Sequence, residues 1–167
     1  MAAIEVEHGI LVEASDTHFA WMLGEVPAPA PDLFLPPDGV DSPQVLRLLR
    51  AMADRLRTAG SRGSWLVVAD NEVVGLCGYK QAPTEDGKVE IGYGIAKCRR
   101  NRGFASRAVN AMLAFAHRDP AVSSVVAATS VSNEASQSVL ERNGFEQTGT
   151  SDDPEDGTLI WWRRELG

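Results

Sequence analysis

The strongest constraint on the fold of this chain is a single apolar segment that runs from Phe104 to His117. Its apolar residues occupy nearly every side of a helix with 3.6 residues per turn, so the segment predicts a buried helix. Asp119 and Pro120 follow and end it, because proline has no N–H to continue the helical hydrogen bonds. The apolar residues are Phe104, Ala105, Ala108, Val109, Met112, Phe115 and Ala116.

Three β-prone segments precede this helix and predict an antiparallel meander. Trp65 to Ala69 and Val73 to Tyr79 flank the turn residues Asp70-Asn71, a pattern typical of a hairpin. A second turn at Thr84 to Gly87 leads into the third segment, Val89 to Ile95.

Further elements follow the buried helix. We expect a strand over Val122 to Thr129 and a short helix over Asn133 to Arg142, with Asn143-Gly144 as its C-cap. Two closing strands are expected at Phe145 to Gly149 and Thr158 to Arg164. A helix packed between strands of this order predicts a mixed α/β sheet covered by helices.

The first 60 residues add a strand and two helices. Ile10 to Ala14 is the strand, and Ser15 or Asp16 is a candidate cap of the helix that follows it. Ser42-Pro43 is a cap and first helical residue for a second helix that ends at Gly60. Between these helices, residues 26–39 contain five prolines and are expected to be irregular, either as the wall of a pocket or as a plain surface connection. We therefore predict one domain over residues 1–167.

The charges of the chain are segregated. Residues 91–118 contain no carboxylate, although the whole chain carries 23 acidic against 16 basic side chains and a net charge of -7. The first 46 residues contain acids and no Lys or Arg, and a second acidic run lies at 152–156. The basic residues of segment 91–118 are Lys97, Arg99, Arg100, Arg102, Arg107 and Arg118. The distribution predicts an anionic ligand at the basic segment, and the acids suggest either a cationic ligand or solubility alone.

Composition excludes several other classes of function. The negative net charge argues against nucleic acid or an anionic membrane as partner. Cys77 and Cys98 lie far apart without neighbouring histidines, so neither a metal site nor a disulfide framework is expected. The chain has no signal-like start and no apolar run of membrane-spanning length, so we expect a soluble, cytoplasmic protein.

The most informative motif is Arg100-Asn-Arg-Gly-Phe-Ala105, between the third meander strand and the buried helix. A helix N-terminus has unpaired N–H groups and a positive dipole end, which together bind phosphate. Gly103 lets the backbone close around an anion because it lacks a Cβ. The alternative is an arginine-rich surface turn that binds no ligand, which could have the same sequence.

Two motifs at family spacing resemble the GNAT-fold N-acetyltransferases. The run Arg100-x-x-Gly-x-Ala105 is similar to the family's acetyl-CoA motif, Q/R-x-x-G-x-G/A, and it follows the strand Glu90-Ile-Gly-Tyr-Gly-Ile95. Asn133-Glu-Ala-Ser136 and the helix that ends in Gly144-Phe145 resemble the second family signature. Within the family, the sequence of these motifs is most similar to that of the branch that contains ribosomal-protein N-terminal acetyltransferases. The resemblance implies a GNAT fold, with a mostly antiparallel central sheet of about six or seven strands and about four helices.

The resemblance also implies a coenzyme A site. The loop Arg100, Asn101, Arg102, Gly103, Phe104 and Ala105 would hold the pyrophosphate, with Arg99, Arg102 and Arg107 as candidates for the ribose 3′-phosphate. The pantetheine arm would pair with the backbone of Tyr93, Gly94 and Ile95, and the glycines at 92 and 94 suggest a bulge or a close ligand there. Asn133 would contact this arm, cap its helix, or both. Ser136 is a surface hydroxyl, a cofactor contact or a proton donor.

Amine acetylation needs a neutral amine and a route for its proton. Glu90 is the only carboxylate between Asp86 and Asp119, so we nominate it as general base, with an exposed strand charge as the alternative. Many family members carry a tyrosine seven residues after the asparagine as general acid, and this chain has Leu140 there. Ser136 or water would replace it, or the thiolate would leave unassisted, since a thiol has a pKa near 8.5.

The function expected from this resemblance is acetyl transfer from acetyl-CoA to a primary amine, in a ternary complex. The alternative is a non-catalytic acyl-CoA-binding or interaction module with the same fold. The acidic segments predict a cationic acceptor, which is a small molecule or a peptide. Either a monomer or a homodimer is compatible with the sequence.

Overall fold

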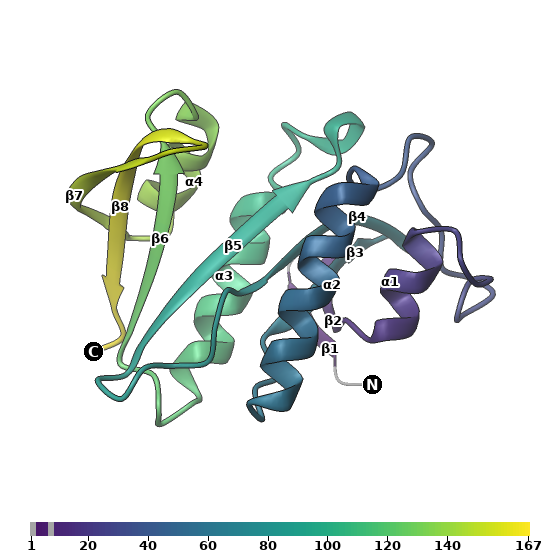
Figure 1. Ribbon diagram of the computed structural model, residues 1–167, viewed down its shortest axis with the longest axis horizontal. Coiled ribbons are helices and arrows are strands. Elements are labelled where there is room, and N and C mark those ends of the chain that lie inside the picture. The colour runs from purple at the N-terminus through teal and green to yellow at the C-terminus, as the bar shows by residue number, and fades with distance from the viewer. Residues whose placement is uncertain (1–2, 7–8) are drawn as a thin grey trace.

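The strands of the computed structural model, which describes residues 3–6 and 9–167, form one sheet of eight strands in the order β1-β2-β3-β4-β5-β6-β8-β7 (Figure 1). Every neighbouring pair is antiparallel except β5 and β6. The strands are β1 (Ala3–Val6), β2 (Gly9–Glu13), β3 (Ser64–Ala69), β4 (Glu72–Tyr79), β5 (Lys88–Ile95), β6 (Ser124–Ser130), β7 (Glu146–Asp153) and β8 (Gly157–Glu165). The predicted mixed α/β class is confirmed, and β1 is a short additional strand.

Four α-helices accompany the described sheet, and their starts follow the predicted caps. They are α1 (Asp16–Met22), α2 (Pro43–Thr58), α3 (Phe104–His117) and α4 (Glu134–Arg142), with one 3-10 turn, η1 (Lys97–Arg99). The hydroxyl of Ser15 accepts from the His18 N–H and that of Ser42 from the Val45 N–H, both at 3.2 Å. These bonds satisfy N–H groups that have no partner inside the helix.

The helices cover both faces of the sheet, and the alternation of side chains along β3 shows how. Trp65 and Val67 belong to the same buried cluster as α3, whereas Leu66 and Val68 belong to the cluster under α1 and α2. Figure 1 shows α2 in front of the sheet and α3 behind it. The apolar segment is therefore buried as predicted, and α3 has the predicted bounds.

The turn between β3 and β4 shows why the meander is tight. Asp70 and Asn71 both have positive φ, 50° and 65°, as a two-residue hairpin turn with the twist of its strands requires. Asp and Asn tolerate this region better than most residues. The predicted hairpin is confirmed.

The proline-rich segment 26–39 is irregular, as predicted. It touches the sheet through Phe34, which makes an isolated bridge with Glu72 at the start of β4. Leu33 and Leu35 pack against the cluster under α1 and α2. The segment is therefore attached at its apolar centre, and Val40, which follows it, is buried.

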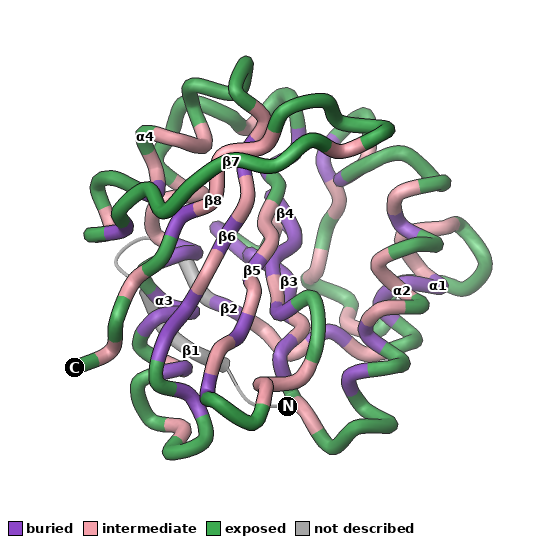
Figure 2. The backbone as a smooth tube through the Cα atoms, turned by 60° about the vertical axis from the view of Figure 1, so that its left-hand side comes forward, coloured by how far each residue is buried: buried purple, intermediate pink, exposed green. Residues whose placement is uncertain are grey.

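The closing hairpin is longer than predicted. β7 continues to Asp153, which pairs with Gly157, so the first two acids of the run 152–156 lie in the strand. β7 is exposed along nearly its whole length, as the outer strand in Figure 2. Because neither face of this strand is buried, no apolar alternation marked its extent in the sequence.

The two halves of the sheet touch only over a short length. β5 and β6 pair in parallel at three positions, Lys88 with Ser124, Val89 with Val125 and Glu90 with Val126. Beyond them β5 stays with β4 and β6 stays with β8, so the two strands diverge, as Figure 1 shows. The backbone of β5 after Glu90 therefore has no strand partner on its β6 side.

Candidate functional site

A loop with a left-handed backbone precedes α3. Asn101 has a φ of 63°, and Gly103, the N-cap of α3, has a φ of 82°. Left-handed residues of this kind turn successive N–H groups toward one side, where they form an anion-binding concavity. The first N–H groups of α3 add the positive end of the helix dipole. The loop predicted to bind an anion therefore has a backbone geometry suited to it, and anion binding itself stays a prediction.

The arginines around this loop have different partners. Arg100 donates from Nε to the carbonyl of Ile95 at 3.1 Å, which joins the loop to the end of β5. Arg99 makes a two-point pair with Glu72, at 2.6 and 3.1 Å, so its charge is compensated. Arg107 donates to the carbonyl of Arg102 at 3.2 Å, and its guanidinium lies 5.0 Å from the centre of the Phe104 ring. Of these three arginines, only Arg99 is paired with a carboxylate among the described residues, and the Nε of Arg107 is buried without a hydrogen-bond partner there.

A cavity of about 600 Å³ extends from this loop toward α4, and we call it the α4 cavity. It collects most of the residues that the sequence analysis assigned to the cofactor. Those that line it are Tyr93, Gly94, Ile95, Arg99, Arg100, Asn101, Gly103, Phe104, Ala105, Asn133 and Ser136. Arg102, also assigned to the loop, is exposed and is not among the lining residues.

The far wall of the α4 cavity comes from one face of α4, and the sequence analysis missed it. Ala135, Ser138, Val139 and Arg142 line it, and their spacing of three, four and seven residues was the available signal. The amide nitrogen of Asn143 donates to the hydroxyl of Ser106 at 3.2 Å, which fixes the end of α4 against the first turn of α3. Arg142 is thereby held near the anion loop.

The free edge of β5 lies between this cavity and a second one. The pairing of β4 with β5 runs from Gly75–Ile95 to Tyr79–Ile91 without a shift, so the bulge suggested for the glycines at 92 and 94 does not occur. An added Cβ at Gly94 would meet no other atom within 4 Å. Gly94 therefore leaves open space beside the unpaired edge of β5. This is the space that the other explanation for these glycines, a ligand close to the backbone, requires.

The second cavity, about 440 Å³, lies between α2 and the strands β4 and β5, and we call it the α2 cavity. It shares four lining residues with the α4 cavity, namely Tyr93, Gly94, Asn133 and Ser136. The two cavities therefore meet where β5 and β6 diverge, and we call these four residues the junction.

Hydrogen bonds fix the side chains at the junction. The hydroxyl of Tyr93 donates to the carbonyl of Ser136 at 3.2 Å, and burial raises the pKa of Tyr93 to about 12. The amide oxygen of Asn133 accepts from the N–H of Ser136 at 3.2 Å, so Asn133 is a helix cap. Its cap role and a ligand contact can coexist, because it also lines both cavities. Leu140 is completely buried and lines neither cavity.

The family model described as "Acetyltransferase (GNAT) domain" matches residues 30–146, which include the anion loop and the junction. The chain belongs to the GNAT acetyltransferase family. An uncharacterized N-acetyltransferase of Bacillus subtilis, YjdG, is 34% identical over 94 residues, which are 54% of this chain and 56% of that protein. The uncharacterized N-acetyltransferase p20 of Bacillus licheniformis is 29% identical over 94 residues. The chain spans about half the length of these curated relatives.

Solved structures share the GNAT fold with this chain. One is an acetyltransferase of Salmonella typhimurium that modifies the N-terminal serine of the 50S ribosomal subunit protein L7/L12; its TM-score is 0.75 and its identity 20%, over 99% of this chain and 100% of that chain. Another is RimL, a ribosomal L7/L12 alpha-N-protein acetyltransferase in complex with coenzyme A, with a TM-score of 0.74 and 20% identity over 98% of both chains. The identities are low, so these likenesses establish the fold.

Glu90, the nominated base of this GNAT domain, lies apart from the junction. Its carboxylate is 3.1 Å from the Nζ of Lys80, the residue that follows β4, and Glu90 lines neither cavity. Strand geometry of ~3.3 Å per residue puts its Cα about 13 Å from that of Gly94. A direct contact between Glu90 and a group at Gly94 is excluded by this length, and only a chain of water would connect them.

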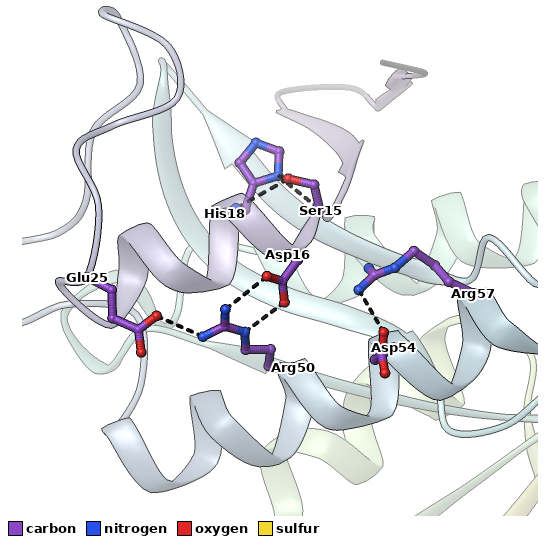
Figure 3. A network of polar contacts seen from close by, with 7 residues as sticks. All are labelled: Ser15, Asp16, His18, Glu25, Arg50, Asp54 and Arg57. Atoms are coloured by element: carbon purple, nitrogen blue, oxygen red, sulfur yellow. Dashed lines mark hydrogen bonds and ion pairs between the residues drawn. The ribbon is translucent and has the colours of Figure 1, made fainter.

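Several acids of the first 46 residues serve to join α1 and α2 of the GNAT domain. Arg50 of α2 donates to Asp16 at 2.7 Å and to Glu25 at 2.9 Å, as Figure 3 shows. The Arg50 hydrogen bond holds the pKa of Asp16 below its ordinary value. Glu13 pairs with Arg62 at 3.0 Å. Three of the eight acids of the first 46 residues, Glu13, Asp16 and Glu25, are thus compensated within the fold.

Over residues 3–6 and 9–167, no three His, Cys, Asp or Glu side chains are grouped as a metal site would need. In the same part of the chain, every helix is too short or too polar to cross a membrane.

Proposed function

We propose that this chain is an acetyl-CoA-dependent N-acetyltransferase, which transfers the acetyl group directly to a primary amine in a ternary complex. The observation that carries the proposal is the junction: two cavities, one of which begins at an anion loop, meet at the unpaired edge of β5. A donor in one cavity and an acceptor in the other would meet there. Proximity of this kind removes much of the entropic barrier to a reaction of two molecules.

In this proposal the α4 cavity holds acetyl-CoA. The N–H groups of the loop Arg100–Ala105 bind the pyrophosphate, and the free guanidinium nitrogens of Arg100 add charge-assisted contacts. The pantetheine arm lies along the open edge at Tyr93, Gly94 and Ile95, whose backbone groups have no strand partner on the β6 side. Arg142, which also lines this cavity, supplies a further cation for the phosphate groups.

The transfer step balances without a further reactant. The neutral amine attacks the thioester carbonyl, a C–N bond forms, the C–S bond breaks, and the proton lost by the amine compensates the one gained by the coenzyme A thiolate. A backbone N–H at the β5 edge stabilises the oxyanion. The hydroxyl of Tyr93 donates to the carbonyl of Ser136 and thereby supports the position of Ser136 at the junction.

Ser136 and Glu90 are the proposed catalytic residues. Ser136 lines both cavities, so its hydroxyl reaches the departing sulfur as a hydrogen-bond donor. Glu90 acts through water as general base, because its distance and its pair with Lys80 leave no direct contact. Glu90→Gln is expected to lower kcat toward lysine-type amines, which are almost fully protonated at neutral pH, more than toward α-amines of pKa near 8.

The test is turnover. The protein is incubated with acetyl-CoA and a panel of amines, and free thiol is followed over time; acceptor-dependent release supports the proposal. Coenzyme A binding without release of free thiol over a broad panel of amines would favour the non-catalytic module. That alternative is supported by Leu140, a buried residue at the position where many family members have a tyrosine as general acid. Arg100→Ala and Gly103→Glu should weaken coenzyme A binding in both cases, and unchanged affinity would contradict the assigned loop.

The acceptor is an amine of a small molecule or a peptide, in line with the relative that modifies an N-terminal serine. The cytoplasm is the location that fits an acetyl-CoA-dependent enzyme of this composition, and nucleic acid does not fit its net charge of -7.

A further inference from the structure

The charges that line the α2 cavity are few. Among the lining residues, the charged side chains are Asp41 and Lys80. Lys80 is paired with Glu90 at 3.1 Å, so its charge is largely compensated. Asp41 has no ion pair within the part of the chain that the structure describes, and one of its oxygens accepts from the N–H of Ser42 at 2.7 Å. That bond fixes the carboxylate and leaves its other oxygen free.

Asp41 lies at the end of α2 that faces the diverging strands. The other end of α2, at Thr58, leads within a few residues into Ser64, which pairs with Gly78 and through it with Gly92. The N-terminal end of α2 therefore extends toward the tip of β5, as Figure 1 also shows. Asp41 is exposed, and it lines the same cavity as the four junction residues.

The rest of the α2 wall is apolar. Val45, Leu49, Met52 and Leu56 recur at helical spacing and all line the cavity, while the basic side chains of α2 lie on its other faces. Arg50, for example, is turned to Asp16 and Glu25 (Figure 3). An occupant of this cavity would meet one uncompensated negative charge and then a wall of aliphatic groups.

We propose that the acceptor is a primary amine with a single positive charge and an apolar substituent, that Asp41 binds its ammonium group as it enters the α2 cavity, and that this group gives a proton to water before the neutral amine attacks the thioester. The proposal rests on the proposed function and narrows its acceptor. A second ammonium group would have to lie against the aliphatic wall near Lys80 without a carboxylate, and an unpaired buried charge is costly. Polyamines and other multiply charged amines are thus poor acceptors, which narrows the cationic acceptor expected from the acid-rich segments to one with a single charge.

Pentylamine and cadaverine form a matched pair of probes, since they differ by one terminal ammonium group on the same carbon chain. Their reactive amines have similar basicity, near that of lysine at about 10.4, so the neutral fraction is the same. We expect kcat/KM to be at least about tenfold higher for pentylamine. Each methylene from ethylamine to pentylamine should raise kcat/KM up to about fourfold, the factor that burial of one methylene supplies.

Asp41→Asn is the second arm. Asparagine keeps an oxygen for the Ser42 N–H and removes only the charge, so we expect the KM for pentylamine to rise about fivefold, as for an exposed ion pair, with the KM for acetyl-CoA unchanged. Asp38→Asn is the matched control, because Asp38 is an exposed acid three residues earlier that does not line the cavity. Equal use of cadaverine, or an Asp41→Asn enzyme with an unaltered KM, would overturn the proposal.

Binding separates this proposal from the proposed function. Pentylamine is titrated into the coenzyme A complex and followed by ligand-observed NMR, which needs no turnover. Pentylamine binding that weakens in Asp41→Asn and not in Asp38→Asn supports the site even if no amine is acetylated. Absence of pentylamine binding, with coenzyme A bound, refutes the site whatever other amines do.

Discussion

Gly103→Ala tests the anion loop with a minimal change. Gly103 has a φ of 82°, where an alanine side chain collides with its own backbone, at a cost of about 1 kcal/mol. The new Cβ would lie 3.3 Å from Nη1 of Arg107, the far end of a flexible side chain that can move aside. The expected loss of unfolding free energy is therefore about 1 kcal/mol, which lowers the melting temperature of a chain of this size by about 2–4 °C.

The same substitution should weaken coenzyme A binding. Relief of the strained backbone at residue 103 rotates the N–H groups that face the phosphates, and we expect the dissociation constant to rise about tenfold. At a coenzyme A concentration 100 times the wild-type Kd, the wild type gains about 2.7 kcal/mol of stability and the variant about half of that.

Thermal unfolding with and without coenzyme A measures both effects, and Gly60→Ala is the control. Gly60 has a φ of 76° with open space around it, and it follows the end of α2, outside both cavities. Both variants should lose similar stability without ligand, and only Gly103→Ala should lose part of the ligand-induced gain. Equal gains in the two variants would refute the assignment of the phosphate to this loop.

Three further predictions concern stability. Leu140→Tyr places a larger, polar ring in a fully buried position, so it should cost about 1–3 kcal/mol in a melting experiment and bring no gain in activity. Burial lowers the pKa of His18 below 6.5, so the unfolded chain takes up a proton before the folded chain does as the pH falls. The contribution of His18 to stability is therefore complete above pH 6.5 and declines below it. His18→Asn should flatten that decline in thermal melts recorded at a series of pH values. Arg50→Met should lower the melting temperature at neutral pH, and the difference from wild type should shrink as the pH falls below 3.8, since the lowered pKa of Asp16 contributes only while its carboxylate is charged. A pH-independent difference would contradict the role of that pair.

The sequence predicted those elements whose signal is local. α3 has its predicted bounds because an apolar run, a glycine cap and an Asp-Pro stop all act within one segment. The loop Arg100–Ala105 and the cap Asn133 were predicted for the same reason. The exposed strand β7 was predicted too short, because a strand without a buried face has no apolar alternation to mark its end.

Features that depend on distant partners were not predictable. The pairing of Asp16 and Glu25 with Arg50 joins segments 34 and 25 residues apart, so the acidic N-terminal region gave the impression of uncompensated charge. The pair of Glu90 with Lys80 depends on the register of β4 and β5. Arg142 was missed because α4 shows which of its faces lines the cavity only when it is packed against Ser106 of α3.

The three paired positions of β5 and β6 also have a mechanical consequence. In the described chain they form the only β-ladder between two otherwise continuous half-sheets, β1 to β5 and β6 to β8. Backbone pairing over so short a length restrains the relative motion of the two half-sheets only weakly. A ligand whose amides bond to the edge at Tyr93, Gly94 and Ile95 would act as an extra strand between them. Cofactor binding would then connect the two half-sheets, and this would be visible as slower hydrogen exchange of the backbone amides at the tip of β5.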